Sequence, residues 1–334
     1  MVLHPSHHIV PTAPTIGTPG ESYNQGVTLH PHVRRFLTTS PAAPPLDTRS
    51  VEDNRAHLAQ VVPLTGDPAP VDHVPDTRIA DVPVRVYVPA VPAVPAAAGP
   101  LPCVVYFHGG GWVTGGLDLA DTTVRALATG AGAVGVSVDY RLAPEHPFPA
   151  AVDDALAVVG AVLAGDTGLR IDTGRVAVAG DSAGGNLAAV VAQQLRGHSP
   201  ALVHQALFYP VTDASTTDTD SYRAFGEGHG LSTRDMEWFI GHYAGTADRR
   251  DPRLSPLHNP DLTGLPPATI ITAGCDPLAS EGRAYGRALV KAGTRASVIE
   301  FPGQMHAFLD LGTLLDDALT ARRLVAGQLR AAFA

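Results

Sequence analysis

The chain has 334 residues, 45% of them hydrophobic, and carries a formal net charge of -9. This length and apolar content can supply the core of one large domain or two ordinary ones, which excludes a disordered or fibrous protein. The negative charge and the absence of a dense run of Lys and Arg argue against a nucleic-acid partner.

The N-terminal residues 1–15 lack the basic start and the continuous apolar segment of a secretory signal. His4, His7 and His8 lie there among prolines, which give no fixed geometry for a metal ion, so no metal site is expected. The uncharged apolar stretch 86–107 is interrupted by prolines and is not expected to cross a membrane. We therefore expect a soluble, cytoplasmic protein without stable membrane association.

Short apolar runs separated by helix-length segments begin near residue 71, whereas residues 1–70 are irregular and rich in proline. Within 78–89, three valines alternate with Arg85 and Tyr87 at a period of two, which indicates a strand pair, or the second half of one, with one buried face. Continuous runs rich in β-branched residues are typical of strands buried on both faces, and four follow: 103–107, 133–138, 175–179 and 269–273. Cys103 and Cys275 lie beside such runs and are expected to be unpaired packing residues.

Helical spacing occupies the intervening segments, for example 151–163 and the region from Leu187 to Leu195. A last strand is expected at 297–301 and a closing helix at 311–333. The alternation predicts an α/β fold with a mainly parallel central sheet flanked by helices. Residues 211–259 break this rhythm and are expected to form an insertion over the sheet, and the Ala and Pro tract 89–102 an exposed connection.

Gly180 to Gly184 form a G-x-S-x-G pattern directly after one predicted strand and directly before a predicted helix. A serine on so sharp a turn is held in a strained backbone conformation, and the flanking glycines remove side chains that would collide with it. The alternative is that these glycines only begin a helix and the serine has no catalytic role. The strand and helix context favours Ser182 as a nucleophile.

His108 precedes three consecutive glycines at the end of another predicted strand. Bare backbone amides can stabilise the anion of a tetrahedral intermediate, so we assign Gly109, Gly110 and the Ala183 amide to an oxyanion hole. A phosphate-binding loop is the alternative, but no Lys-Ser or Lys-Thr follows the glycines. His108 itself is expected to brace the loop.

A serine nucleophile needs a base and an acid that orients the base. Asp276 lies just past the strand 269–273, and His306 follows the strand 297–301 by a short loop. The chain order Ser, Asp, His matches that of α/β-hydrolases. We therefore predict Ser182, Asp276 and His306 as a catalytic triad.

These residues resemble the bacterial hormone-sensitive-lipase-like esterases, also called family IV lipolytic enzymes. The resemblance runs from about residue 71 to the C-terminus and rests on four motifs: 108–111, 139–149 reading D-Y-R-L-A-P-E-H-P-F-P, 180–185 reading G-D-S-A-G-G, and 276–278. One departure is Ser280 before Glu281, where the family usually has two acids.

The resemblance implies an α/β-hydrolase fold, the same triad and no cofactor. It also implies a helical cap built from the N-terminal segment 1–70 and the insertion 211–259. The catalytic domain then comprises 71–210 and 260–334.

The expected activity is hydrolysis of short- to medium-chain carboxylic esters, small-molecule substrates, through an acyl-enzyme. An amide hydrolase or deacetylase with the same triad is one alternative, and a non-catalytic ligand receptor on this fold is another. Five aromatic residues are expected to contact the substrate: Trp112, Phe225, Trp238, Phe239 and Phe308. Ordinary core packing is the alternative for each of them. A homodimer stays open.

Overall fold

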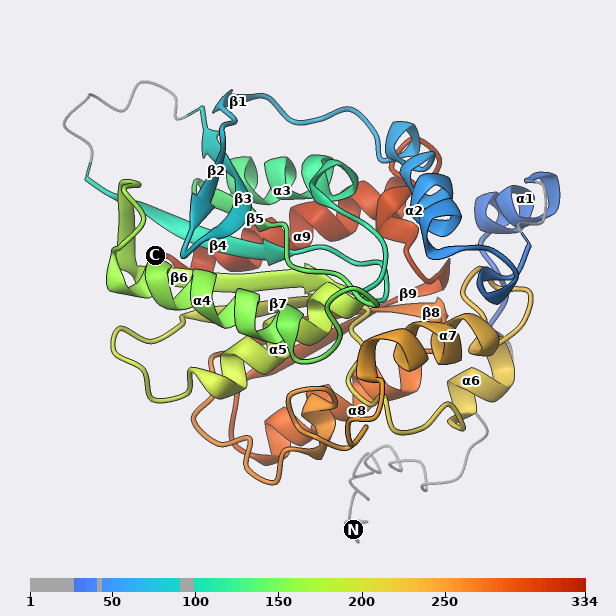
Figure 1. Ribbon diagram of the computed structural model, residues 1–334. Coiled ribbons are helices and arrows are strands. Elements are labelled where there is room, and N and C mark those ends of the chain that lie inside the picture. The colour runs from blue at the N-terminus through green and yellow to red at the C-terminus, as the bar shows by residue number, and fades with distance from the viewer. Residues whose placement is uncertain (1–26, 41–43, 91–98) are drawn as a thin grey trace, which may run out of the picture.

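The computed structural model describes residues 27–40, 44–90 and 99–334 (Figure 1). The histidine-bearing tail with His4, His7 and His8 lies outside the described residues. So do the rest of residues 1–26, residues 41–43 and most of the Ala and Pro tract. The fold below therefore concerns the remaining part of the chain.

A nine-stranded sheet runs through the described residues in the order β1-β3-β5-β4-β6-β7-β8-β9, with β2 paired to β3. The pairs from β5 through β4 to β9 are parallel, and β3 pairs antiparallel with β1, β2 and β5. The strands are β1 Val71–His73, β2 Asp76–Ile79, β3 Val82–Pro89, β4 Leu101–Phe107, β5 Val134–Val138, β6 Ile171–Asp181, β7 His204–Phe208, β8 Ala268–Cys275 and β9 Ala296–Met305. The predicted α/β fold with a mainly parallel sheet is confirmed.

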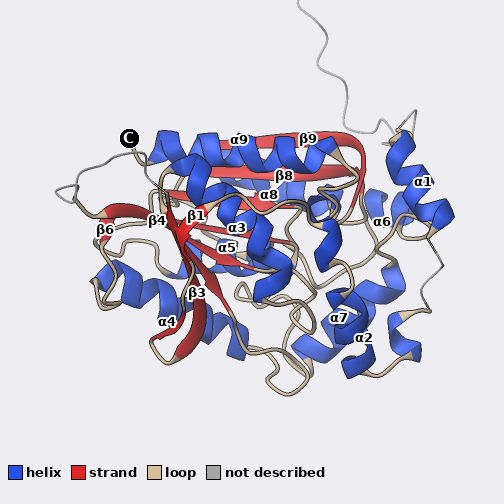
Figure 2. Ribbon diagram, turned by 90° about the horizontal axis from the view of Figure 1, so that it is seen from above, coloured by secondary structure: helices blue, strands red, loops and turns tan. Residues whose placement is uncertain are grey.

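Helices cover both faces of the sheet, as Figures 1 and 2 show. The two helices α3 and α9 pack against each other on one face, and α4, α5 and α8 lie on the other. Their bounds are α3 Leu117–Ala131, α4 Ala150–Ala164, α5 Ala183–Gln194, α8 Ala279–Lys291 and α9 Asp316–Ala332.

The apolar central strands are explained by these two layers. In β4, Val105 and Phe107 join the core beneath α4 and α5, whereas Val104 and Tyr106 join the core beneath α3 and α9. Successive side chains of a strand point to opposite faces, so a strand covered on both sides needs apolar residues at every position. Both cysteines are buried and unpaired, which confirms their packing role.

The remaining elements lie near the carboxyl ends of the parallel strands (Figure 1). They come from the N-terminal segment, from the inserted region after β7 and, for η4 alone, from the loop after β9. Their bounds are α1 Pro31–Thr39, η1 Leu46–Thr48, α2 Val51–Ala59, η2 Val62–Leu64, α6 Asp220–Phe225, α7 Thr233–Ala244, η3 Pro256–His258 and η4 Phe308–Asp310. Asp47 of η1 pairs with Arg234 of α7 at 2.8 Å, so the two regions meet.

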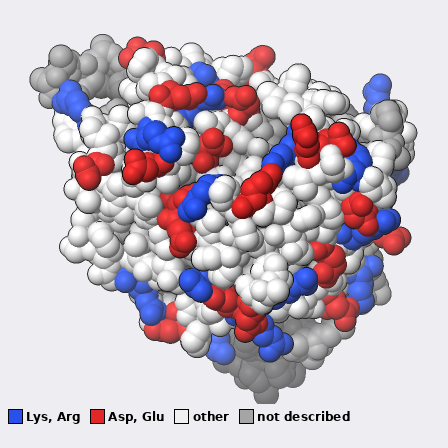
Figure 3. All heavy atoms as spheres, in the orientation of Figure 1, with Lys and Arg blue, Asp and Glu red and all other residues white. Residues whose placement is uncertain are grey.

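On the surface face drawn in Figure 3, acidic and basic side chains are interspersed. Across the described ranges, no helix combines the length and the apolar character that a membrane crossing requires.

Candidate active site

Ser182 lies on the turn between β6 and α5 with φ +53° and ψ -116°, a strained conformation for a residue with a side chain. A Cβ atom at Gly184 would come closer than 3.0 Å to backbone atoms of Phe107 and His108, and one at Gly180 would meet the Gly184 backbone. Glycine is therefore required at both positions. The Ser182 amide donates to the Phe208 carbonyl at 2.8 Å, which fixes the turn on β7.

The structure brings Ser182, His306 and Asp276 into one hydrogen-bonded chain. The Ser182 hydroxyl lies 2.9 Å from His306 Nε2, and His306 Nδ1 lies 2.8 Å from Asp276 Oδ2. With the ring proton on Nδ1, the imidazole donates to the carboxylate and accepts from the serine. Ser182 and His306 each retain 8% exposure, whereas Asp276 is fully buried. The buried carboxylate thus orients the imidazole, and the serine keeps some contact with solvent.

Neighbouring groups hold the imidazole and the carboxylate in place. The second oxygen of Asp276 accepts the Leu278 amide at 2.8 Å, just before α8 begins. The ring of Tyr209 meets the His306 ring edge to face, with centroids 4.8 Å apart. These contacts restrict the rotation of both side chains.

Asp181, the residue before the nucleophile, holds the glycine loop. Its Oδ1 accepts the Gly109 amide at 2.9 Å and the Tyr106 hydroxyl at 2.7 Å. Burial raises the pKa of Asp181, and these two donors act in the opposite direction. Sequence reasoning missed this role, although the aspartate stands inside the G-x-S-x-G pattern.

The Asp181 contact corrects the predicted oxyanion hole, because the Gly109 amide is already engaged. The amides of Gly110, Gly111 and Ala183 have no hydrogen-bond partner among the described residues. Gly110 and Gly111 have φ values of +111° and +59°, which favour glycine. The free donors are therefore one residue further along the loop than predicted.

His108 is buried beneath the loop, where its Nδ1 donates to the Gly109 carbonyl at 2.7 Å. Its ring stacks on Tyr140, whose hydroxyl donates to the His108 carbonyl at 2.7 Å. Burial lowers the pKa of His108 to about 4, so the ring is neutral near pH 7. These contacts agree with its expected bracing role.

The five aromatic residues expected to contact substrate divide into two groups. Trp112 and Phe308 have no exposed surface: Trp112 stacks on Tyr243, and Phe308 packs on Tyr209. Their assignment to a substrate pocket is corrected to core packing.

The other three belong to the inserted region. The Phe239 ring of α7 lies directly over Gly111, closer than 3.0 Å to where a Cβ would stand. The rings of Trp238 and Phe239 pack edge to face with their centroids 5.2 Å apart. Phe225, the last residue of α6, is buried. Of the five, Phe239 is therefore the one seated on the glycine loop.

Glu281, the retained acid of the family motif, is buried, and its Oε1 accepts the Thr212 amide at 2.7 Å. Burial raises its pKa well above the ordinary value. Ser280, which replaces the usual first acid, exchanges hydrogen bonds with Ser221: each hydroxyl accepts the other residue's amide, at 3.1 and 3.2 Å. The substituted position thus joins α8 to α6 of the insertion.

Among the described residues, no group of three or more His, Cys, Asp and Glu side chains could hold a metal ion. A serine on a strand-to-helix turn, with an aspartate and a histidine after later strands of the same parallel sheet, defines the α/β-hydrolase class of proteins.

Comparisons with known proteins agree with this class. Residues 104–310 match the family described as alpha/beta hydrolase fold. The chain is 41% identical over 298 residues to the carboxylic ester hydrolase LipN of Mycobacterium tuberculosis, covering 86% of this chain and 78% of that protein. It is 42% identical over 242 residues to the ethyl acetate hydrolase of Pseudomonas putida, covering 71% and 74%.

Among solved structures, an ester hydrolase from the metagenome of Lake Arreo, complexed with a bipyridine phosphonate derivative, is 39% identical with a TM-score of 0.84. That match covers 92% of this chain and 99% of the other. The chain belongs to the alpha/beta hydrolase fold family, and the resemblance to the hormone-sensitive-lipase-like esterases is confirmed.

Proposed function

We propose that this chain is a carboxylic ester hydrolase in which Ser182 is the nucleophile, His306 the general base and Asp276 the residue that orients the base. The observation that carries the proposal is the continuous hydrogen-bonded chain from the serine hydroxyl through the imidazole to the carboxylate, with links of 2.9 and 2.8 Å. The ester hydrolases among the chain's relatives support the choice of substrate class.

In the proposed reaction, the Ser182 oxygen attacks the ester carbonyl while His306 Nε2 accepts the hydroxyl proton. The tetrahedral intermediate collapses to an acyl-enzyme as His306 returns the proton to the leaving alkoxide. A water molecule then attacks the acyl-enzyme with His306 again as base, and the acid is released. The buried Asp276 carboxylate stabilises the imidazolium formed in each half of the cycle.

The oxyanion of each tetrahedral intermediate is assigned to the amides of Gly110, Gly111 and Ala183, all without a partner among the described residues. The Ala183 amide also stands at the N-terminus of α5, where the helix dipole favours negative charge. Loss of one such donor typically costs about 3 kcal/mol of transition-state stabilisation.

The cap is proposed to consist of the N-terminal segment 1–70 and the insertion 211–259, placed over the catalytic domain formed by 71–210 and 260–334. The ion pair between Asp47 and Arg234 supports this division, because it joins the two cap regions to each other. The position of Phe239 over Gly111 supports a cap that reaches the glycine loop.

Short- to medium-chain acyl esters are the proposed substrates. Phe239 is proposed to limit the space beside Gly111, and Trp238 and Phe225 to support it within the cap. A series of p-nitrophenyl esters of increasing acyl length tests this: kcat/KM should be highest at two to eight carbons, and a maximum at sixteen would contradict it.

Matched ester and anilide substrates separate an esterase from the alternative amide hydrolase or deacetylase. We expect p-nitrophenyl acetate to be turned over far faster than p-nitroacetanilide, and Ser182→Ala to lower ester turnover by about 10⁴-fold or more. Wild-type protein that bound esters without hydrolysing them would favour the receptor alternative. The cytoplasmic location and the homodimer stay predictions.

A further inference from the structure

Arg55 of α2 joins the N-terminal segment to the catalytic domain through its whole guanidinium group. Its Nε donates to the Val113 carbonyl at 2.8 Å and its Nη2 to the Ala143 carbonyl at 3.0 Å. The Glu145 carboxylate accepts from Nη1 and Nη2 at 2.8 and 2.7 Å. A planar fork of this kind can hold two backbone segments and a carboxylate at once, which a lysine ammonium cannot do in the same geometry.

The carbonyls that Arg55 binds belong to the backbone around the proposed oxyanion hole. Val113 closes a turn that begins at Gly110, because its amide donates to the Gly110 carbonyl at 3.1 Å. The Ala143 amide donates to the Trp112 carbonyl at 2.9 Å. Arg55 therefore holds the turn directly at Val113 and indirectly, through Ala143, at Trp112.

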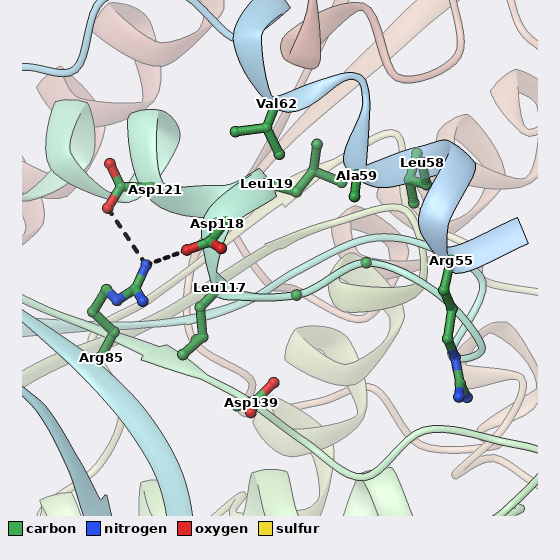
Figure 4. A pocket seen from close by; sticks show the side chains of 12 residues that line it. Arg55, Leu58, Ala59, Val62, Arg85, Leu117, Asp118, Leu119, Asp121 and Asp139 are labelled. Atoms are coloured by element: carbon green, nitrogen blue, oxygen red, sulfur yellow. Dashed lines mark hydrogen bonds and ion pairs between the residues drawn. The ribbon is translucent and has the colours of Figure 1, made fainter. Parts of the chain in front are cut away.

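The backbone that follows this turn, at Gly115 and Gly116, borders a cavity. A cavity of about 680 Å³ lies between α2 and the start of α3, and Gly115 and Gly116 line it just after the turn. Figure 4 shows Leu58 and Ala59 of α2 and Val62 of η2 along one side of it, with Arg55 at one end. Close packing normally fixes a backbone, so an adjoining cavity leaves more of that task to hydrogen bonds.

We propose that Arg55 is a positioning residue for the oxyanion hole: by holding the turn 110–114, it fixes the Gly110 and Gly111 amides in place. Docking of the N-terminal part of the cap is then required for full turnover, beyond its role as a cover. This inference rests on the proposed function, because it assigns those amides to the oxyanion.

Arg196 offers a matched control. It also donates to two backbone carbonyls, of Asp261 and Thr263, and pairs with the Asp261 carboxylate at 2.7 Å. Its side chain is 35% exposed and that of its acid 51%, close to the 31% and 54% of Arg55 and Glu145. It follows the far end of α5, roughly 18 Å along the helix from the nucleophile.

The test compares wild type with Arg55→Ala, Arg55→Lys and Arg196→Ala, using p-nitrophenyl acetate as substrate and a trifluoromethyl ketone as a reversible inhibitor whose adduct places an oxyanion in the hole. For Arg55→Ala we expect kcat to fall about 10-fold or more with KM changed less than about 3-fold, since misplaced amides weaken the transition state rather than the substrate complex. The ketone's inhibition constant should rise in proportion to the loss of kcat/KM. Arg55→Lys should be intermediate, and Arg196→Ala within about 2-fold of wild type.

Chemical rescue adds a readout that a merely structural role would not move. Guanidinium chloride at about 20 mM, far below denaturing levels, should raise the kcat of Arg55→Ala and leave that of Arg196→Ala unchanged. Ammonium chloride at the same concentration should rescue less, because it lacks the planar fork.

The inference is overturned if Arg55→Ala keeps wild-type kcat, or loses kcat without a matching loss of ketone affinity, or if Arg196→Ala loses as much. Should Arg55→Ala fail to fold, Arg55→Lys and Glu145→Gln decide: the first should lower kcat, and the second, which keeps both carbonyl contacts, should stay within about 3-fold of wild type. Inactive wild-type protein would refute the proposed function, whereas active wild type with equally active Arg55 variants would refute this inference alone.

Discussion

Replacement of Gly111 by alanine tests whether the cap rests on the glycine loop as the structure places it. A Cβ at this position would approach three ring atoms of Phe239 more closely than 3.0 Å, and the backbone φ of +59° lies in the left-handed region. Two separate costs follow. The conformation penalises any side chain at residue 111, and the contact penalises only a side chain that meets Phe239.

The two costs have different sizes and different readouts. A left-handed conformation costs a non-glycine residue about 1–2 kcal/mol, which should appear in the free energy of unfolding. Carbon atoms in contact lie about 3.5–4.0 Å apart, so the Phe239 ring or the loop must shift by roughly 1 Å or more. A displacement of that size at a reacting centre can lower kcat/KM about 100-fold, equivalent to about 2.7 kcal/mol.

The assay is kcat/KM on p-nitrophenyl acetate together with urea unfolding, for Gly111→Ala, Phe239→Ala and the double variant. In the Phe239→Ala background, Gly111→Ala should lose about 10-fold or less, while its unfolding penalty persists. Gly241→Ala, on the same helix with nothing within 4 Å of the added Cβ, is the control and should keep wild-type activity. An equal loss of kcat/KM from Gly111→Ala with and without Phe239 would refute the reasoning.

Two further predictions concern buried polar groups. Arg322 is 2% exposed and donates to the carbonyls of Thr65 and Leu309. Because Arg322→Met leaves these buried carbonyls without a donor, it should lower the free energy of unfolding, measured by urea titration, by about 3–5 kcal/mol. A decrease below about 1 kcal/mol would contradict this prediction. Burial lowers the pKa of His204 from 6.5 to about 4, so below pH 6.5 the unfolded state binds a proton that the folded state resists, and stability falls down to about pH 4. The free energy of unfolding should therefore fall between pH 7 and pH 4, and His204→Gln should reduce that fall by on the order of 3 kcal/mol. If the fall in the variant equals that in wild type, the result counts against a buried neutral ring.

The sheet was largely predictable because strands covered on both faces are continuous apolar runs. The strand β7 was missed, since His204 and Gln205 open it with polar side chains. His204 lies within hydrogen-bond distance of the Thr269 hydroxyl, and Gln205 donates to the Pro266 carbonyl. Such partners come from distant parts of the chain and leave no local pattern.

The triad residues could be proposed from the sequence because parallel strands end at one edge of the sheet, so residues just past three strand ends meet. Which glycine amides stay free could not be read, because that depends on Asp181 reaching Gly109 from a neighbouring strand. Likewise, Trp112 follows the glycines, yet its ring is buried against Tyr243 of α7. The role of Arg55 left no motif at all.

Mapping the residue modified by an activated phosphonate tests the central claim most directly. The reagent forms a stable adduct only with a nucleophile that a base has activated, beside hydrogen-bond donors that stabilise the developing negative charge. Digestion and mass spectrometry should place a single phosphonyl group on Ser182, and His306→Ala should prevent the labelling. Stoichiometric labelling of any other residue, or undiminished labelling of Ser182 without His306, would contradict the account.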